Sequence, residues 1–587
     1  EGLQYSIECR APVAQPSTEE ILLDANELAK HVSFVDIGVM EVSDDGTRLA
    51  YSLDTTGFRD YTLHVLELGS RAPGPEQIAK VSSAAWTGDG RTLFYTVEDE
   101  AKRPYRLYRH AIGGSAPDAL VYEESDERFV LQVWRSRSKA FVFAGSFSHT
   151  ASELRFVSAA TPEAAFTVVA PRRADHEYEV DHRGDRFYIR SNDRGRNFRI
   201  ATAPVSAPNE AHWQELVPHR DAVMVEHLDV FDRFMVLHER ENGVPYVRVS
   251  DPEGAAAHRV ALPEPVYEVY PEENPEAGSD RYRFSYESLT TPETHYDYVV
   301  ADRSLALVKQ KQVLGGYDPA HYRSERITAR AGDGTQIPIS LVRRADAPAG
   351  PQPLLLTGYG AYGYPLPAAF SYSRVSVLDR GVTYAIAHVR GGGELGKRWH
   401  DAGRMQHKAN TFGDFIAAAE HLIRSGYTAS DRLAIEGASA GGLLIGAVVN
   451  QRPDLFRAAL LDVPFVDVLN TMSDTSLPLT VGEFEEWGNP ALPDQYRTIA
   501  AYSPYDNLRA QSYPAILVET SYNDSQVMYW EPAKYVAKLR SLKKDHNPLL
   551  LWVNMAGGHG GSSGRYDQWR ERAFDLAFLL SQLGVKR

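Results

Sequence analysis

The sequence predicts two domains, an N-terminal all-β propeller and a C-terminal α/β domain with a doubly wound, mostly parallel sheet. Two observations lead to this prediction: short strands repeat in the first half of the chain, and strands alternate with helices in the second. With 587 residues the chain is too long for a single hydrophobic core. The pattern changes around Gly315, so we assign residues 1–315 to a propeller that gates the site and residues 316–587 to the α/β domain.

The first half repeats one pattern of strands. Six turn-and-strand segments begin at intervals of 44 to 49 residues, at Gly46, Gly90, Ser138, Gly184, Phe231 and Asp280. A second strand follows each segment at a fixed offset, and both alternate apolar and polar residues, so one face of each strand is buried. Repeats of this length made only of strands are typical of four-stranded propeller blades. We count six blades between about residues 35 and 302 and expect residues 1–30 and 303–313 to complete a seventh. The alternative is an irregular β-sandwich.

The second half alternates buried strands with helices. From about Pro353, short apolar runs such as PLLLTGYG and RLAIEGAS end in glycine or polar residues, and helical segments such as TFGDFIAAAEHLIRSG separate them. This alternation builds a parallel sheet, and ligands gather at the carboxyl ends of its strands. Functional residues are therefore expected just after strands.

The composition argues against several classes of protein. Hydrophobic residues make up 43% and charged residues 24%, as in soluble globular proteins. The single cysteine, Cys9, rules out a disulfide framework and a Cys-rich metal site. No apolar run approaches the roughly 20 residues that span a bilayer. The net charge of -16 argues against nucleic acid and favours cationic ligands.

These features predict no nucleic-acid or membrane partner, and we expect a monomer or small homo-oligomer, which the features themselves do not decide. We expect it in the cytoplasm. A periplasmic or secreted location stays open because the sequence begins at Glu1 and targeting information can be missing.

Gly437-Ala-Ser439-Ala-Gly441 is the strongest local motif for chemistry. It lies between a predicted strand at 432–436 and a helix predicted from Gly442 onward. A G-x-S-x-G sequence in that context is typical of a nucleophile elbow, in which a strained turn exposes the serine hydroxyl. The motif therefore predicts an α/β-hydrolase with Ser439 as nucleophile, and the alternative is a structural turn.

A serine hydroxyl needs a base to take its proton, and in this fold an acid and then a histidine follow later strands. Asp524 follows AILVETSYN, and His559 follows LLLWVNMAGG. Asp506 and Glu519 are the rival acids, but Asp524 lies just past a strand end, where it can orient His559.

The oxyanion of the tetrahedral intermediate needs two donors. The backbone N–H of Ala440 supplies one at the start of the predicted helix. The loop Gly358-Tyr-Gly-Ala-Tyr-Gly363 follows a strong strand, and from the residues alone either Tyr359 or Tyr362 offers the second.

Three carboxylates occur within four residues, at Glu483, Glu485 and Glu486, and two aromatic residues are interleaved with them. Buried together they would need a cation, which a guanidinium or ammonium of a substrate can supply. On a solvated helix turn they would have no functional meaning. The residues alone leave both interpretations open.

Seven segments of the second half belong together as a set. They are Arg390-Gly-Gly-Gly-Glu-Leu-Gly, Asn410-Thr-Phe-Gly-Asp-Phe, Gly437-Ala-Ser-Ala-Gly-Gly, Val463-Pro-Phe-Val-Asp, Gly557-Gly-His-Gly, 478–490 and 529–534. The first five resemble the prolyl oligopeptidase family, and the last two resemble its oligopeptidase B branch. The similarity extends over nearly the whole chain and is densest from about residue 390 to 570.

The resemblance implies a seven-bladed propeller above an α/β-hydrolase, and an endopeptidase that cleaves short peptides after Arg or Lys. By position, Ser439, Asp524 and His559 are similar to the family's catalytic triad.

The resemblance also assigns residues that contact the substrate. Tyr359, rather than Tyr362, matches the family's oxyanion tyrosine. Glu483 and Glu485 match the carboxylates that receive the basic side chain at P1, the residue before the cleaved bond.

The chain departs from the family in three places. Gln526 stands where the family has an arginine that holds the substrate backbone, so it is a candidate for weaker, uncharged substrate binding. Residues 364–370 lack the acids that favour a second basic residue at P2. We also expect that the N-terminal segment which partly builds the family's hydrolase domain is missing.

The expected reaction is acyl transfer through a covalent acyl-enzyme on short cationic peptides, with no metal or organic cofactor. The alternatives are prolyl oligopeptidase or acylaminoacyl-peptidase specificity, a carboxylesterase, and a non-enzymatic binding propeller joined to a degenerate hydrolase.

Overall fold

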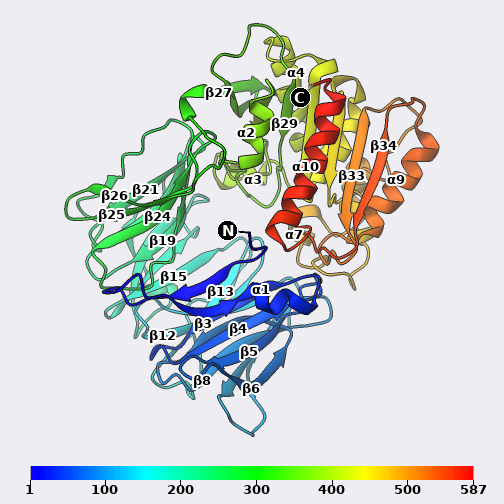
Figure 1. Cartoon of the computed structure of the whole chain (residues 1–587). Helices are drawn as coiled ribbons and strands as arrows, with labels where there is room; N and C mark the ends of the chain where they lie inside the picture. The colour runs from blue at the N-terminus through cyan, green and yellow to red at the C-terminus, as the bar shows by residue number, and fades with distance from the viewer. Residues whose placement is uncertain (1, 586–587) are drawn as a thin grey trace.

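The computed structural model describes residues 2–585 and shows two domains, one packed on the other (Figure 1). Antiparallel sheets of four strands fill most of the N-terminal domain, and the C-terminal domain holds one eight-stranded sheet between helices. The last small sheet ends at Gln310 and the large sheet begins at Tyr322. The predicted division near residue 315 falls between these two strands.

Each four-stranded sheet is a meander of consecutive strands, as the repeat predicts. The described residues contain six of them: β3–β6 (Asp36–Val42, Arg48–Asp54, Thr62–Glu67, Ala72–Ala79), β7–β10 (Val81–Trp86, Thr92–Glu98, Pro104–Ala111, Ala119–Glu123), β11–β14 (Val130–Arg135, Phe141–Phe147, Ser152–Ser158, Thr167–Val168), β15–β18 (Tyr178–Arg183, Arg186–Ser191, Arg199–Pro204, Gln214–Val217), β19–β22 (Val223–Val230, Met235–Glu241, Val244–Ser250, His258–Arg259) and β23–β26 (Glu268–Pro271, Arg281–Glu287, Thr294–Val299, Ser304–Gln310).

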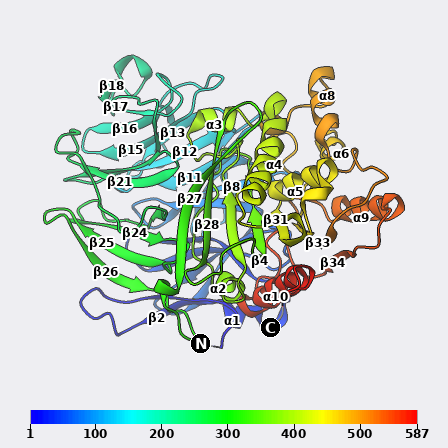
Figure 2. The same cartoon turned by 90° about the horizontal axis from the view of Figure 1, so that it is seen from above.

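Hydrophobic clusters join each sheet to the next, which makes the sheets blades of a propeller. Between the third and fourth sheets, for example, Phe143 packs against Phe187 with ring centroids 5.8 Å apart. Between the fifth and sixth sheets, Phe231 packs edge-on against Tyr282 at 6.0 Å. Successive blades lie side by side in Figure 2. The apolar faces that the alternating strands predict are therefore buried between blades.

The N-terminal strands are arranged differently from the prediction. β1 (Ile7–Arg10) and β2 (Glu20–Asp24) form a separate two-stranded sheet. The strand expected near residues 303–313 is β26, which completes the sixth blade and does not pair with residues 1–30. Leu22 of β2 packs against Leu49 of the first blade, so the small sheet extends the stack at that end.

The large sheet has the order β27-β28-β30-β29-β31-β32-β33-β34. The pairs β27–β28 and β28–β30 are antiparallel and the others are parallel. Its strands are β27 (Tyr322–Arg330), β28 (Gln336–Arg344), β29 (Leu354–Thr357), β30 (Thr383–Ala387), β31 (Leu433–Ala438), β32 (Ala458–Asp462), β33 (Ala515–Ser521) and β34 (Leu549–Asn554).

Helices cover both faces of this sheet. The helices of the chain are α1 (Ala25–Leu28), α2 (Tyr372–Leu378), α3 (Lys397–Asp401), α4 (Ala409–Arg424), α5 (Ala440–Gln451), α6 (Val468–Met472), α7 (Phe484–Trp487), α8 (Pro493–Tyr502), α9 (Trp530–Leu542) and α10 (Arg565–Gln582). α4, α5 and α9 share one hydrophobic cluster, and α2 and α10 share the other. In the described part of the chain, no helix is long and apolar enough to cross a membrane.

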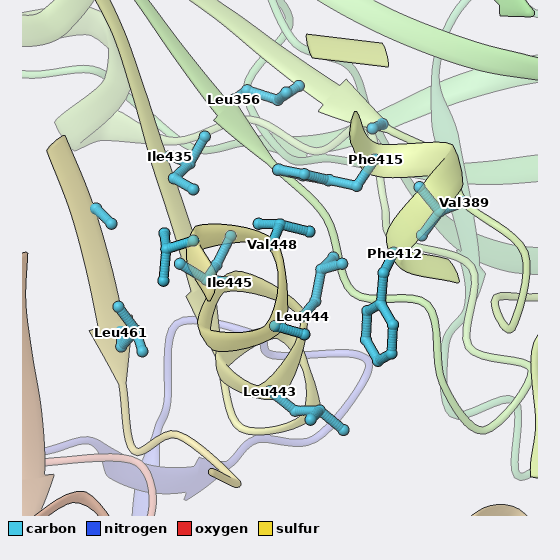
Figure 3. Packing of buried hydrophobic residues seen from close by; sticks show 14 of the residues in the cluster. Leu356, Val389, Phe412, Phe415, Ile435, Leu443, Leu444, Ile445, Val448 and Leu461 are labelled. Carbon is cyan, nitrogen blue, oxygen red and sulfur yellow. The ribbon is translucent and has the colours of Figure 1, made fainter. Parts of the chain in front are cut away.

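The helix-covered sheet explains the continuous apolar runs in the sequence. Leu354 and Leu356 of β29 point into the cluster with α5, whereas Leu355 points into the cluster with α10. Figure 3 shows Ile445 and Val448 of α5 packed beside the strands, with Phe415 of α4 nearby. Because both faces are buried, the polar residues that remain collect at the strand ends.

Polar contacts hold the propeller against the hydrolase domain. Arg196 of the propeller donates to Asp401 from Nη2 to Oδ1 over 2.6 Å. Farther along the interface, Glu268 accepts a hydrogen bond from the Ala368 backbone N–H at 3.2 Å. The propeller therefore covers the hydrolase at separate points, with cavities between them.

Candidate active site

Ser439 lies in a strained turn between β31 and α5. Its φ of 57° and ψ of -119° are unusual for a residue with a side chain, at a cost of about 1–3 kcal/mol. Surrounding hydrogen bonds hold this conformation: Ser439 N donates to Asp462 O at 2.9 Å, and Ser439 O accepts from Phe465 N at 3.1 Å. A Cβ at Gly437 would lie 2.4 Å from Gly441 O, so the turn requires glycine there.

α5 begins two residues earlier than predicted, at Ala440 instead of Gly442. The difference follows from the turn itself, because Ser439 completes the change of direction and Ala440 is already helical. Ser439 is therefore the residue that precedes the first helical turn, whose N–H groups have no partners within the helix. This places the predicted donor, the Ala440 N–H, next to the nucleophile.

Asp524 and His559 form a hydrogen-bonded pair. His559 Nδ1 lies 2.7 Å from Asp524 Oδ2. The other carboxylate oxygen of Asp524 accepts two backbone N–H groups of the following turn, including that of Gln526 at 2.8 Å. Only 1% of Asp524 is exposed. Asp506 instead accepts a hydrogen bond from Ser503 at 2.7 Å.

A propeller loop contacts the turns that carry this pair. Gly57 approaches Gly558 so closely that a Cβ at Gly558 would lie 2.3 Å from Gly57 O. Arg59 Nε donates to Ser525 Oγ at 2.9 Å, directly beside Asp524. The propeller therefore contacts both turns. Sequence reasoning missed this contact because nothing in the residues 57–59 marks a partner so far away in the chain.

Tyr359 is the tyrosine beside the nucleophile. It lines a cavity of about 100 Å³ together with Ser439. Burial raises the pKa of its hydroxyl to about 12, the negative charge of Glu483 adds to this, and a hydrogen bond with the Ser439 side chain acts in the opposite direction. The Tyr359 hydroxyl is therefore a neutral donor at physiological pH.

The hydroxyl of Tyr362, the other tyrosine of this loop, is hydrogen-bonded to Glu483. Its hydroxyl donates to Glu483 Oε2 at 2.9 Å, so its proton is already engaged. Its φ of 61° is a left-handed conformation that costs a non-glycine residue about 1–3 kcal/mol. Both tyrosines line the cavity at Ser439, but the Tyr362 proton is engaged by Glu483, so the geometry favours Tyr359 as the oxyanion donor, and this assignment stays a prediction.

The side chains of the three neighbouring carboxylates lie in three different surroundings. Glu483 lines the cavity at Ser439. Glu485 lines a separate cavity of about 1030 Å³ between the domains, with Arg128 Nη1 3.8 Å away. Glu486 is completely buried and accepts a hydrogen bond from His400 Nε2 at 2.6 Å. Glu483 and Glu485 line different cavities in this structure, because residues two apart on a helical turn face different directions, and the assignment of both to the P1 side chain stays a prediction.

Burial raises the pKa of Glu483 to about 7, against the effect of hydrogen bonds from Trp487 and Tyr362. Both of these bonds end on Oε2. Within residues 2–585 no Lys or Arg forms an ion pair with this carboxylate. No hydrogen bond to Oε1 is present in the described part of the chain.

Gln526 lies where two cavities meet. The small cavity at Ser439 and a second one of about 480 Å³ share Gln526, Glu483, Tyr362 and Leu479 in their walls. Propeller residues of the loops at 99–103, 127–130 and 147–149 complete the wall of the larger cavity. A substrate chain that reaches Ser439 from this cavity passes both domains.

Comparison with known proteins agrees with both halves of the chain. The model described as "Prolyl oligopeptidase, N-terminal beta-propeller domain" matches residues 1–311, and the model "Prolyl oligopeptidase family" matches residues 368–586.

Similar proteins include dipeptidyl aminopeptidase BI of Pseudoxanthomonas mexicana, 46% identical over 97% of this chain and 79% of that protein. Protease 2 of Moraxella lacunata is 36% identical over 99% of this chain and 85% of that protein. Among solved structures, oligopeptidase B from Leishmania major has a TM-score of 0.96 and 36% identity, covering 100% of this chain and 84% of that one.

Replacing Asp524 with Asn tests the acid–base pair, and Asp506→Asn is its matched control. An amide in place of the Asp524 carboxylate would hold His559 in the wrong tautomer, so we expect kcat for a fluorogenic peptide amide to fall by about 10⁴-fold. Asp506 does not contact His559, and its variant should keep kcat within a few-fold of the unmodified protein. Equal losses in both variants, at equal melting temperature, would contradict the assignment.

Proposed function

The chain belongs to the prolyl oligopeptidase family of serine peptidases, and we propose that it cleaves short peptides on the carboxyl side of Arg or Lys. The observation that carries this specificity is that Glu483 lines the cavity beside Ser439 and, within residues 2–585, accepts hydrogen bonds on Oε2 alone. A buried carboxylate without a cation is costly, and a guanidinium or ammonium at P1 supplies the missing charge. The net charge of -16 also attracts cationic peptides at long range.

In the proposed mechanism, the Ser439 hydroxyl attacks the carbonyl carbon of the scissile bond while His559 takes its proton. The Tyr359 hydroxyl and the Ala440 N–H stabilise the oxyanion. His559 then gives the proton to the leaving amine, and the acyl chain stays on Ser439. Water, activated by His559, attacks the ester and releases the acid. Asp524 orients the imidazole and stabilises its charged form.

Substrate size is proposed to follow from the propeller. The larger cavity beside the site is walled by propeller loops and by Gln526. A flexible peptide can thread between such walls, whereas a folded protein cannot bring its backbone to Ser439. This supports an oligopeptidase rather than a general proteinase.

Release of dipeptides from a free N-terminus is a second candidate. It is favoured by the name of the relative that is 46% identical, dipeptidyl aminopeptidase BI. Gln526 adds a reason within the chain, because a neutral amide beside the P2 backbone does not repel the ammonium group of a free N-terminus. An arginine at that position would repel it.

The pH dependence of selectivity tests the role of Glu483. Because its pKa is raised to about 7, the carboxyl is mostly neutral below that pH and charged above it. The ratio of kcat/KM for an Arg amide to that for an uncharged ester should therefore rise about tenfold from pH 6 to pH 8. Taking the ratio cancels the pH dependence of the steps that both substrates share.

Two isosteric variants complete this test. Glu483→Gln should give a low ratio that does not change with pH, whereas Glu485→Gln should keep the ratio and its pH dependence. A flat ratio in the unmodified protein, or a larger effect of Glu485→Gln, would refute the assignment of Glu483.

Endopeptidase and dipeptidyl-peptidase action are separated by the N-terminus of the substrate. Gly-Arg amides with a free and an acetylated N-terminus are compared. An endopeptidase should cleave the acetylated form at least as fast, and a dipeptidyl peptidase should require the free amine. For the second function, Gln526→Arg should slow the free-amine substrate much more than the acetylated one. Equal slowing would remove Gln526 from that account.

A further inference from the structure

Two buried charged side chains form hydrogen bonds with the loop that carries Tyr359. We call Gly358–Gly363 the oxyanion loop. On one side of it, Lys408 Nζ donates to Gly360 O at 2.5 Å. On the other side, Glu486 Oε1 accepts the Tyr362 N–H at 3.1 Å. Neither Lys408 nor Glu486 has a role in the proposed chemistry.

Both side chains are buried, where an ionised group is costly unless other groups stabilise its charge. Lys408 is 2% exposed and Glu486 is fully buried. Burial lowers the pKa of Lys408 to about 8, and Glu486 opposes this effect. Burial alone would raise the pKa of Glu486, but a hydrogen bond from His400 and the charges of His400 and Lys408 bring it below its usual value. Two ionised groups are thus kept out of water beside one loop.

Several residues of the oxyanion loop have strained or sterically restricted backbone conformations. Tyr362 has a φ of 61°, and its ring stacks on His149 with centroids 5.5 Å apart. Gly360 has a φ of 74°, and a Cβ there would lie 2.4 Å from Thr411 Cγ2. At the start of the loop, Gly358 O lies 2.9 Å from where a Cβ on Gly441 of α5 would be. The loop therefore packs closely against α4 and against the first turn of α5, behind Ser439.

We propose that Lys408 and Glu486 are positioning residues for oxyanion stabilisation. By fixing the Gly360 carbonyl and the Tyr362 N–H, they hold the oxyanion loop so that the Tyr359 hydroxyl stays beside Ser439. This inference rests on the proposed role of Tyr359. Glu486 stands three residues after Glu483 on the same helical turn, so one turn supplies the P1 carboxylate and supports the oxyanion loop.

The test removes both charges at once, in the variant Lys408→Met/Glu486→Met. Single changes would leave the other of the two charges buried without its counterpart, whereas two apolar side chains of similar size remove both. The double change also takes the hydrogen-bond partner of His400, so its melting temperature is compared with that of the unmodified protein. The concentration of competent sites is set by titration with a fluorophosphonate. We expect kcat for an Arg peptide amide to fall about 10- to 100-fold, a part of the loss that removal of a whole oxyanion donor causes. KM should change by less than about threefold.

The same double change is then made in a Tyr359→Phe background. If Lys408 and Glu486 act through the Tyr359 hydroxyl, the double change should cost less than about twofold there, because that hydroxyl is already absent. An equal loss in both backgrounds overturns the proposal and leaves the proposed function intact. If Tyr359→Phe alone leaves kcat unchanged, the assigned role of Tyr359 fails, and this inference fails with it.

Lys543→Met is the matched control for loss of a buried lysine. Lys543 follows α9, pairs with Asp545 and does not contact the oxyanion loop. It should keep kcat unchanged. A fall in kcat equal to that of the double variant would show that loss of any buried lysine charge is sufficient, and would also overturn the proposal.

Discussion

The hydrogen bond from Ser439 N to Asp462 O is the constraint on which the site depends. It ties the end of β31 to the end of β32 and holds the serine in a conformation that a free chain avoids. α5 starts immediately afterwards, so the nucleophile stands at a fixed place above the sheet. β33 and β34 are the next strands in the sheet order, and the residues that follow them are Asp524 and His559. The nucleophile, the acid and the base therefore follow the carboxyl ends of strands in the same half of the sheet, β31 to β34.

The three carboxylates near this turn, Glu483, Glu485 and Glu486, differ in the cations that lie close to them. Glu486 has Lys408 and His400 inside the hydrolase domain. Glu485 has Arg128 from the propeller at 3.8 Å. Glu483 receives only neutral hydrogen bonds, from Tyr362 and Trp487. The carboxylate without an internal cation is the one that faces Ser439, and this contrast gives the site its proposed preference for basic residues.

Local patterns in the sequence predict much of this. The strand repeat marks the blades because each strand alternates apolar and polar residues, and the elbow motif marks Ser439 because the turn requires glycines on both sides. Asp524 is favoured over its rivals because it follows a strand, and in the structure it is hydrogen-bonded to His559. The directions of the Glu483, Glu485 and Glu486 side chains could not be predicted, because they depend on how one helical turn is rotated about its axis. The contacts of Lys408 and Arg59 depend on tertiary packing over long separations and leave no local signal. The prediction that residues 1–30 and 303–313 complete one blade is wrong because β26 pairs with β25 and β1 pairs with β2, and a strand pattern alone does not identify the partner of a strand.

The most direct measurement is a crystal structure of the protein with a peptide argininal bound covalently to Ser439. The account predicts a hemiacetal oxygen within hydrogen-bond distance of the Tyr359 hydroxyl and the Ala440 N–H, with the guanidinium on Glu483 Oε1. His559 should lie within hydrogen-bond distance of Ser439 Oγ. A guanidinium bound at Glu485 or in solvent, or a His559 ring far from the adduct, would contradict it.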